Sequence, residues 1–277
     1  MTVDLADLAA AHPGMDFARA AVVDTGWDYV VVDTGAVVFR VPRRPAVAEV
    51  LKVERRLLAL LAPRLPVAVP ALELHRLADG TVYGAYPRLP GRPATCDDPA
   101  ALAPDVVPFL HALHRVDATD AVAVGLAAPG KLDLDLLVRR ATAEVVPLLP
   151  WEAVEALREA FATLREPVPM ECVIHGDLGE SNLLVDGGRL TGVLDWTDAH
   201  VGDPAMDLTW WVQCLGPAAA REAFAEYRSP AGVDVESLWR RAVAHATVQP
   251  VHAVLYGMDN DLGSYVRRQL ARLVPVR

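Results

Sequence analysis

Short apolar runs alternate with Gly- and Asp-containing breaks along the beginning of the chain. The runs are rich in Val and other β-branched or aromatic residues, and each break is only a few residues long. Runs of this kind are typical of strands joined by tight turns, so they predict an antiparallel meander. The expected strands are residues 20–23, 29–32 and 36–41.

A different periodicity follows the meander. Residues 46–62 place apolar side chains at helical spacing and end near Pro63, so they predict one main helix. Two later runs, residues 67–74 and 81–86, return to the strand pattern. Together these elements predict a five-stranded sheet that carries one main helix.

Pro and Gly are dense in residues 86–93, and the pattern changes there. The part before this segment is mostly strand-like, whereas the part after it has mostly helical periodicity, so we expect a stiff connector between two units. The predicted division gives an N-terminal unit, residues 1–88, and a C-terminal unit, residues 89–277. The helices expected in the second unit are residues 101–116, 133–146, 151–164 and most of 204–273.

The most informative stretch is residues 173–207. Two apolar runs flank a polar loop, and an Asp-Gly-Gly turn leads into a third run; the runs are residues 173–174, 183–185 and 190–194. This pattern predicts a loop followed by a β-hairpin. We expect such a hairpin to bring three oxygen-bearing side chains to one end of a small sheet, those of Asp177, Asn182 and Asp195.

These three side chains suit phosphoryl transfer from a nucleotide. That reaction needs a carboxylate that orients the acceptor hydroxyl and accepts its proton, and Asp177 suits this role. It also needs hard oxygen ligands for the Mg²⁺ ion that bridges the phosphates, and Asn182 and Asp195 supply them. An Asp, an Asn five residues later and an Asp beyond the next hairpin match the spacing of a kinase site.

Nearby histidines and carboxylates have simpler explanations. His175 could belong to the ligand set of a metal-dependent hydrolase, but the other histidines are scattered, so we expect it to brace the loop by hydrogen bonds. His111 and His114 share a helix face without a third ligand nearby in the sequence, which favours packing or capping over metal binding. Asp203 and Asp207 lie at the start of a predicted helix, and capping and loop bracing are their expected roles.

Several phrases of the sequence together resemble one family. They are His175-Gly176-Asp177 with Asn182, Leu194-Asp195-Trp196, and Gly202-Asp203-Pro204-Ala205 with Asp207. In this order and spacing the motifs resemble the aminoglycoside and macrolide phosphotransferase family, relatives of the protein kinases. The resemblance implies an α+β, bilobal, protein-kinase-like fold, with a small N-terminal antiparallel β lobe that carries one main helix and a larger, mostly helical C-terminal lobe.

The resemblance also implies nucleotide-binding residues in the N-terminal lobe. The phrase FRVPRR, residues 39–44, is similar to the family's apolar-basic-apolar-Pro-basic signature. Arg40 is therefore expected to contact phosphates and to pair with Glu54 of the next helix. The alternatives are that Arg43 or Arg44 makes these contacts and that Glu54 is a solvated helix charge.

Two further segments complete the expected nucleotide site. Gly26 and Asp28 lie between the first two strands, where a covering loop would approach the phosphates, and Gly26 stands there without the Gly-rich pattern of protein kinases. The nucleotide base is expected at the connector, against backbone groups near Tyr86, Arg88 and Leu89. The donor that the resemblance implies is GTP or ATP, together with Mg²⁺.

The expected acceptor is a small molecule. Asp203 follows Asp195 by only eight residues, so the long activation segment with which protein kinases hold a protein substrate is missing. The phrases RVPRR, AYPRLPGRPA and LDWTDAHVGDPAMD most resemble macrolide phosphotransferases. That resemblance implies transfer to the 2'-hydroxyl of a macrolide amino sugar and resistance to the antibiotic.

Two alternatives remain open. Asn182 departs from the His that macrolide enzymes often carry at this place, so an aminoglycoside kinase or a metabolic alcohol kinase is the alternative in the same class. An alternative in another class is a pseudokinase that binds nucleotide without catalysis, although the intact set of Asp177, Asn182 and Asp195 argues against it. The aromatic residues of the last third of the chain could line an apolar ligand pocket, but at helical spacing they more often form core.

Composition and charge limit which classes of binding partner are expected. The 277 residues are 53% hydrophobic and 22% charged, which is typical of a globular protein. A formal net charge of -10 disfavours nucleic acid as a partner and is compatible with a cationic acceptor such as a macrolide, although solubility alone is the simpler explanation. We expect a monomer.

The sequence also predicts a cytoplasmic location. No run is long and uncharged enough to span a membrane, and the first residues carry Asp4 and Asp7 without a basic residue, unlike a secretory signal. Cys96, Cys172 and Cys214 are widely spaced and lack a C-x-x-C pair, so they are expected to be reduced thiols.

Overall fold

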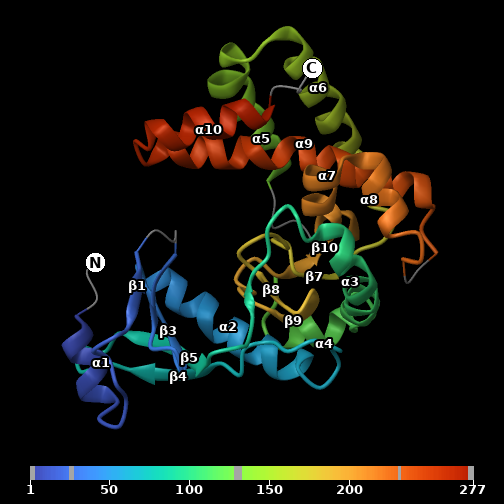
Figure 1. Ribbon diagram of the computed structural model, residues 1–277. Helices are drawn as coiled ribbons and strands as arrows, with labels where there is room; N and C mark the ends of the chain where they lie inside the picture. The colour runs from blue at the N-terminus through green and yellow to red at the C-terminus, as the bar shows by residue number, and fades with distance from the viewer. Residues whose placement is uncertain (1–3, 25–27, 128–132, 230–231, 274–277) are drawn as a thin grey trace.

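The computed structural model describes residues 4–24, 28–127, 133–229 and 232–273. Figure 1 shows two lobes: a small one built on a sheet and helix α2 (blue to cyan), and a larger, mostly helical one (green to red). The antiparallel N-terminal sheet and the helical remainder confirm the predicted α+β fold class. The division of the chain at residue 88 stays a prediction.

The small lobe contains a five-stranded sheet in the order β1-β2-β3-β5-β4, in which every neighbouring pair is antiparallel. Its strands are β1 (Ala21–Val23), β2 (Tyr29–Asp33), β3 (Val37–Pro42), β4 (Glu73–Arg76) and β5 (Val82–Pro87). The predicted meander is confirmed. The strand predicted at residues 67–74 is wrong in its bounds, since only the end of that range lies in β4. Pro66 and Pro70 have no amide hydrogen to donate, so the segment around them does not join a ladder.

Alternation along β3 decides which face of the sheet each side chain covers. Phe39 and Val41 pack with Leu8 of α1 (Leu5–Ala11) in one buried cluster. Arg40 points to the opposite face, toward α2 (Pro45–Leu61), whose apolar stripe is buried. Glu54 lies within that stripe and is 1% exposed, so the sheet and the helix place a buried cation beside a buried carboxylate.

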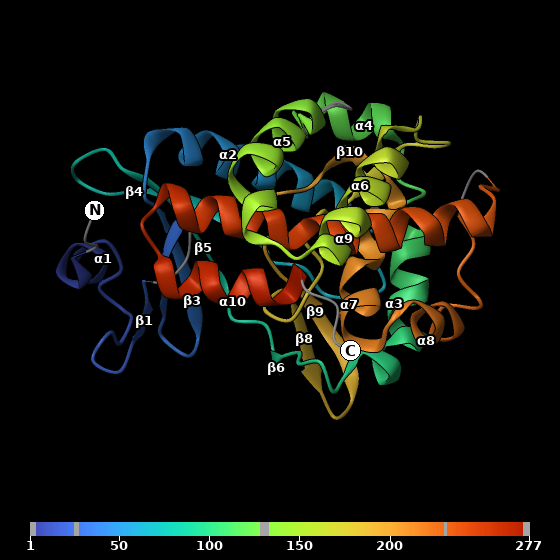
Figure 2. The ribbon, with the colours of Figure 1, turned by 90° about the horizontal axis from the view of Figure 1, so that it is seen from above.

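Helices make up most of the large lobe. They are α3 (Pro99–Leu113), α4 (Ala118–Ala123), α5 (Leu134–Arg140), α6 (Trp151–Arg165), α7 (Thr209–Leu215), α8 (Pro217–Ala223), α9 (Val235–Asp259) and α10 (Gly263–Leu273). Figure 2 shows α9 running across the lobe with α10 and α6 beside it. Trp210, Trp211, Phe224 and Trp239 are buried in the core, which favours the packing explanation of these aromatic residues over a ligand pocket. Among the described residues, no helix is both long and apolar enough to cross a membrane.

The helix predicted at residues 133–146 is present as a helical segment but is α-helical only in its first part. Helix α5 ends at Arg140, and the chain continues as a π-helical segment (Ala141–Val145) and a 3₁₀ turn (Val146–Leu148). Pro147 has no amide hydrogen, so an α-helical hydrogen-bond ladder cannot continue through it. The spacing of apolar side chains does not distinguish these hydrogen-bond patterns, which explains the error.

Two small sheets carry the central stretch of the chain. Strands β8 (Leu183–Asp186) and β9 (Arg189–Val193) form the predicted hairpin, and β6 (Arg92–Pro93) pairs with β8 at its edge. Strand β7 (Cys172–Ile174) pairs instead with β10 (His200–Gly202). The polar loop between β7 and β8 and the segment between β9 and β10 therefore each connect one small sheet to the other.

The expectation of three reduced cysteines is wrong for this structure. Cys96 and Cys214 form a disulfide with Cα atoms 5.2 Å apart, although 118 residues separate them in the sequence. Cys172 is free and buried. Wide spacing in a sequence carries no sign of such pairing, because only folding brings the end of α7 against the segment before α3.

Candidate active site

The loop that follows β7 is held in place by a buried carboxylate. Asp207, which is 0% exposed, accepts hydrogen bonds from the backbone N–H groups of His175 (3.0 Å) and Gly176 (2.9 Å). Gly176 has a φ of +81°, and a Cβ there would lie 2.7 Å from the carbonyl oxygen of Asp198, so a side chain does not fit. Asp207 therefore braces the loop, as predicted.

His175 ties the same loop to the end of β9. Its ring is buried, and its Nδ1 accepts a hydrogen bond from the N–H of Asp177 at 3.2 Å. Nε2 therefore carries the proton and donates to the carbonyl oxygen of Leu194 at 2.8 Å. Burial lowers the pKa of His175, which favours this neutral ring. The predicted bracing role is confirmed.

His111 and His114, at the C-terminal end of helix α3, also make contacts within the fold. His114 is buried and lies 3.0 Å from an oxygen of Asp207, while its second ring nitrogen meets the hydroxyl of Tyr227 at 2.5 Å. His111 accepts a hydrogen bond from the N–H of Arg228 at 2.9 Å. Both rings therefore make hydrogen bonds within the fold, in keeping with the expected packing role.

Asp177 and Asn182 meet across the loop. The side-chain amide of Asn182 donates to the carbonyl oxygen (2.8 Å) and to the carboxylate (3.0 Å) of Asp177. Since its nitrogen is used in this way, Asn182 has its Oδ1 as the possible cation ligand. Asp177 is exposed, but the protein around it desolvates its carboxyl group and raises the pKa to about 7, and the carboxylates of Asp198 and Asp195 add to the shift. A carboxyl group with such a pKa is suited to accept a proton near neutral pH.

Asp195 lies just beyond β9 in a left-handed backbone conformation. Its φ is +54°, a value that Asn and Asp adopt more readily than most side chains. Its Oδ1 accepts hydrogen bonds from Thr197 Oγ1 (2.7 Å) and Arg40 Nη2 (2.7 Å), and 46% of the side chain is exposed. Burial acts to raise the pKa of Asp195, but the Arg40 cation and the hydrogen bonds with Thr197 together outweigh it and hold the pKa below its usual range. The carboxylate is therefore ionised and open to a cation.

Arg40 links the two lobes. From β3 it donates to Glu54 Oε1 (2.5 Å), to Asp195 and to Thr197 Oγ1 (2.8 Å). The N–H of Trp196 also donates to Glu54 Oε1, at 3.2 Å. Burial acts to lower the pKa of Arg40, but Glu54 and Asp195 outweigh it and raise the pKa, so the guanidinium stays charged. The expected pairing of Arg40 with Glu54 is present, and Glu54 is not a solvated helix charge.

The neighbouring arginines lie at the edge of the small lobe. Arg43 pairs with Asp24 at 2.6 Å, and Arg44 pairs with Asp28. Asp28 is thus tied to the start of α2, and its contact with a nucleotide stays a prediction. Gly26 lies outside the described residues.

Some hydrogen-bonding groups of the connector residues already have partners in the N-terminal sheet. The N–H of Arg88 donates to the carbonyl oxygen of Ala36 at 2.8 Å, and its guanidinium pairs with Asp33 at 2.9 Å. Tyr86 is buried, and Leu89 lies against β9. Because its amide is already bonded, Arg88 can meet a nucleotide base through its backbone only with its carbonyl oxygen.

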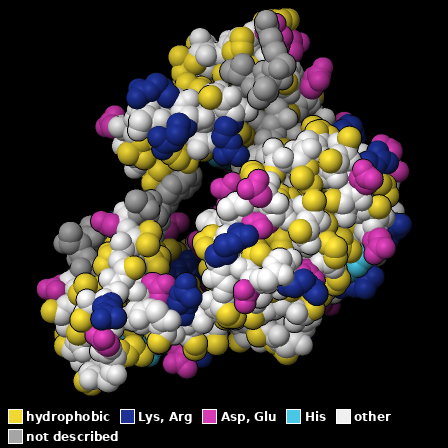
Figure 3. Space-filling view, in the orientation of Figure 1, with side chains coloured by type: hydrophobic (Ala, Val, Ile, Leu, Met, Phe, Trp, Pro, Cys, Tyr) yellow, Lys and Arg dark blue, Asp and Glu magenta, His cyan; other side chains and the backbone are white. Residues whose placement is uncertain are grey.

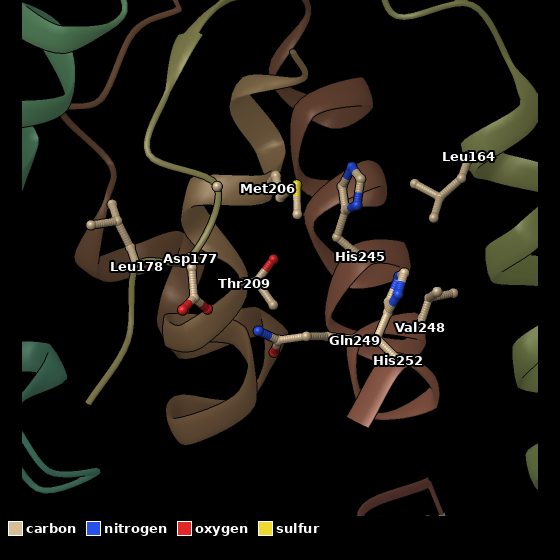
Figure 4. A pocket seen from close by; sticks show the side chains of 10 residues that line it. Leu164, Asp177, Leu178, Met206, Thr209, His245, Val248, Gln249 and His252 are labelled. Atoms are coloured by element: carbon tan, nitrogen blue, oxygen red, sulfur yellow. The ribbon is translucent and has the colours of Figure 1, made fainter. Parts of the chain in front are cut away.

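A pocket opens beside Asp177, between the loop that carries Asp177 and helices α7 and α9. Its lining residues are Leu164, Gly176, Asp177, Leu178, Met206, Thr209, His245, Val248, Gln249 and His252. In Figure 4 the Asp177 carboxylate and the end of the Gln249 side chain point toward each other, with Thr209 beside them. Thr209 is 4% exposed, and its Oγ1 is one of the few buried side-chain atoms of the described residues that make no hydrogen bond within the protein. A buried hydroxyl in this state favours a ligand or water partner in the pocket.

Sequence reasoning missed the residues that α9 contributes to this pocket. His245, Gln249 and His252 recur at helical spacing in an otherwise apolar part of the helix, and this polar stripe was the available signal. His245 is oriented by Asp203 at 2.9 Å, and Asp203 also pairs with Arg241 at 2.6 Å. The predicted capping by Asp203 is confirmed, since it also accepts a hydrogen bond from the N–H of Ala205 at 3.0 Å.

A hollow separates the small lobe from an arm made of α10 and the end of α9 (Figure 3). Helix α10 carries Arg267, Arg268 and Arg272 and no acidic residue. Asn182 and Asp195 offer side-chain oxygen atoms, the kind of ligand that a hard divalent cation such as Mg²⁺ prefers. The site therefore combines a carboxyl group with a raised pKa, oxygen ligands and a fixed cation from the other lobe.

This arrangement defines a class of protein. An antiparallel small lobe, a helical large lobe, and an Asp, an Asn and an Asp gathered beside the lobe-bridging cation are the features of a kinase-like fold. Residues 28–242 match the model of the phosphotransferase enzyme family, and the chain belongs to this family. It is therefore a phosphotransferase enzyme, as predicted.

Three similar proteins show how far the likeness extends. The chain is 28% identical over 262 residues to the YcbJ protein of Bacillus subtilis (strain 168), covering 82% of this chain and 79% of that protein. It is 31% identical to the solved macrolide 2'-phosphotransferase MphH of Brachybacterium faecium, with a TM-score of 0.69 and coverage of 99% and 97%. APH(2")-IIIa, solved with GDP and kanamycin, has a TM-score of 0.83, coverage of 97% and 96%, and 22% identity, so it shows the fold alone.

Proposed function

We propose that this enzyme transfers the γ-phosphate of GTP or ATP to a hydroxyl group of a small molecule, with Asp177 as the proton acceptor. The observation that carries the proposal is the position of Asp177: its carboxylate lines the pocket and also lies in the loop that Asn182 closes. A hydroxyl bound in the pocket would meet this carboxylate, whose pKa of about 7 suits proton acceptance.

The other predicted residues then have defined roles. Asn182 and Asp195 would hold Mg²⁺, which when bound supplies charge neutralisation on the phosphates. Arg40, fixed by Glu54, would contact the phosphates from the small lobe. The connector at Tyr86, Arg88 and Leu89 would hold the base, with residues 1–88 forming the nucleotide lobe and residues 89–277 the acceptor lobe.

The proposed acceptor is a macrolide, phosphorylated at the 2'-hydroxyl of its amino sugar with GTP as the preferred donor, which would confer resistance. Similarity to the macrolide 2'-phosphotransferase MphH over 99% of this chain supports this choice. We further propose that the enzyme acts as a monomer in the cytoplasm, where nucleotides and Mg²⁺ are available. An aminoglycoside or a metabolic alcohol is the alternative acceptor.

The test is phosphate transfer measured by mass spectrometry. Purified enzyme is incubated with Mg²⁺, GTP and ATP, and a panel of macrolides, aminoglycosides and small amino alcohols. A macrolide that gains one phosphate supports the proposal, and phosphorylation of another panel member instead would overturn the substrate while keeping the reaction. Nucleotide binding without any product would favour the pseudokinase alternative.

A matched pair of variants tests the role of Asp177. Asp177→Asn removes the proton acceptor but keeps the size of the side chain, so kcat should fall by about 10²–10⁴-fold. Asp186→Asn, at the exposed end of β8, is the control and should keep full activity. Equal kcat values for the two variants would contradict the assignment.

A further inference from the structure

Three side chains from distant parts of the chain meet beside the catalytic loop, outside the pocket described above. Cys96 lies between β6 and α3, Cys214 lies near the end of α7, and Glu180 lies in the loop that carries Asp177. Their ligand atoms, two sulfurs and a carboxylate oxygen, all lie within 4.8 Å of one another. Glu180 Oε1 is 3.4 Å from Cys96 Sγ.

This group is accessible to solvent. Cys96 and Glu180 are exposed and Cys214 is partly exposed, whereas Cys172 is buried. The Cα atoms of Cys96 and Cys214 are 5.2 Å apart, so the backbone already holds both side chains within reach of one ion. A small reductant or a hydrated cation can therefore reach the pair, while Cys172 is shielded.

The chemistry of the group depends on its redox state. Disulfide sulfurs are weak metal ligands, because it is the thiolate that coordinates. A dithiol or phosphine reductant supplies two electrons, the S–S bond breaks, and each sulfur takes up a proton. A divalent cation can then displace the two thiol protons. Two thiolates and one carboxylate form a ligand set that zinc accepts, with a water molecule at the fourth position.

We infer that Cys96, Cys214 and Glu180 form a redox-gated site for Zn²⁺ or a similar thiophilic divalent cation. The disulfide closes the site, and reduction opens it. Reduced thiols are the expected state in the cytoplasm, where we place the enzyme. Glu180 follows Asp177 by three residues and precedes Asn182 by two, so a bound ion ties the catalytic loop to α7.

Metal titration tests this inference without measuring phosphate transfer. Wild-type protein is reduced with a phosphine, which takes its oxygen from water, and is then titrated with Co²⁺ under anaerobic conditions. We expect thiolate-to-cobalt charge-transfer absorption that saturates at one ion per chain and disappears when Zn²⁺ is added. Protein that keeps its disulfide should show no such absorption.

Variants of the three cysteines assign the ligands. Cys96→Ser and Cys214→Ser should each lose the saturable absorption, and Cys172→Ala, the control thiol, should keep it. Glu180→Gln should weaken Co²⁺ binding by about tenfold or more, since even residues that only support a metal ligand have effects of this size. Absorption that persists in both serine variants, or that vanishes in Cys172→Ala, would overturn the assignment.

Alkylation of the wild type gives a test that does not depend on the folding of a variant. In reduced protein, Zn²⁺ should protect Cys96 and Cys214 from iodoacetamide, as read by peptide mass spectrometry. Equal alkylation of both residues with and without Zn²⁺ would refute the site.

Discussion

One buried cation, Arg40, organises the candidate site at the scale of single residues. Its guanidinium donates to Glu54, Asp195 and Thr197 and lies over the ring of Tyr29, with 4.1 Å between the guanidinium carbon and the ring centroid. Arg40 and Glu54 have side chains that are 5% and 0% exposed. Removing one partner of such a pair leaves an uncompensated buried charge, which costs more than the intact pair contributes.

The cost of leaving Glu54 without its partner can be measured with Arg40→Met. The variant should lower the free energy of unfolding by about 3–5 kcal/mol, because Glu54 is left buried and unpaired. The double variant Arg40→Met with Glu54→Met should regain most of that stability but not the affinity for nucleotide. Denaturant unfolding and nucleotide titration measure the two effects.

Arg44→Met is the matched control for this prediction. Arg44 is exposed and pairs with Asp28 at the surface, so its loss should change the free energy of unfolding by at most about 0.5 kcal/mol. If Arg40→Met were as stable as Arg44→Met, the buried-pair explanation would be wrong.

At the scale of elements, Asp207 holds the loop that carries Asp177, between two small sheets. It accepts hydrogen bonds from two backbone N–H groups of the loop and lies 3.0 Å from His114 Nε2. Burial acts to raise the pKa of Asp207, but its bonds with His114 and the loop outweigh burial and hold the pKa below its usual range. A carboxylate that is harder to protonate in the folded state than in the unfolded state stabilises the fold when it is ionised.

The sign of the pH dependence follows from this shift. The contribution of Asp207 is fully present above the unfolded pKa of about 4 and is lost as the pH falls through the lower folded value. The free energy of unfolding of the wild type should therefore fall below about pH 4. Asp207→Asn should be less stable at neutral pH and should lose part of this acid dependence, as measured by denaturant unfolding at several pH values.

Asp186→Asn serves as the control here as well, since Asp186 is exposed at the end of β8. Its pH profile should follow that of the wild type. If the pH profile of Asp207→Asn ran parallel to that of the wild type, ionisation of Asp207 would not contribute to the pH dependence of stability.

At the scale of the whole molecule, direct contacts join the two lobes beside the proposed nucleotide site. Arg40 of the small lobe meets Asp195 of the large lobe at 2.7 Å, and the N–H of Trp196 donates to Glu54 across the same boundary. A ligand that binds only the folded protein raises its stability by mass action. At 100 times its dissociation constant, a nucleotide with Mg²⁺ should add about 2.7 kcal/mol to the free energy of unfolding.

Thermal unfolding with GTP and with ATP measures this effect and ranks the two donors. A chelator should abolish the part of the shift that needs Mg²⁺, and Asp195→Asn should show the same reduced shift without a chelator. If neither nucleotide raised the melting temperature at saturation, the proposed nucleotide site would be wrong.

Much of the fold and part of the site could be predicted because their signals are local. The meander, helix α2 and the β8–β9 hairpin depend on side-chain periodicity and turn residues within a few positions of one another. The closeness of Asp177 to Asn182 has the same origin, since five residues of one loop separate them. Errors arose at residues 67–74 and 133–146, where proline changed the hydrogen bonding without changing the apolar pattern.

Tertiary structure decided the contacts that join distant segments. Arg40 and Asp195 are 155 residues apart in the sequence, and the disulfide joins residues 118 apart. The pocket brings Asp177 together with Thr209 and with His245 on α9. The sequence by itself determined the elements and the chemistry of the loop, because periodicity and turn preferences act over a few residues. Which side chains from other elements complete the site depended on packing, because burial of apolar faces sets how sheets and helices meet.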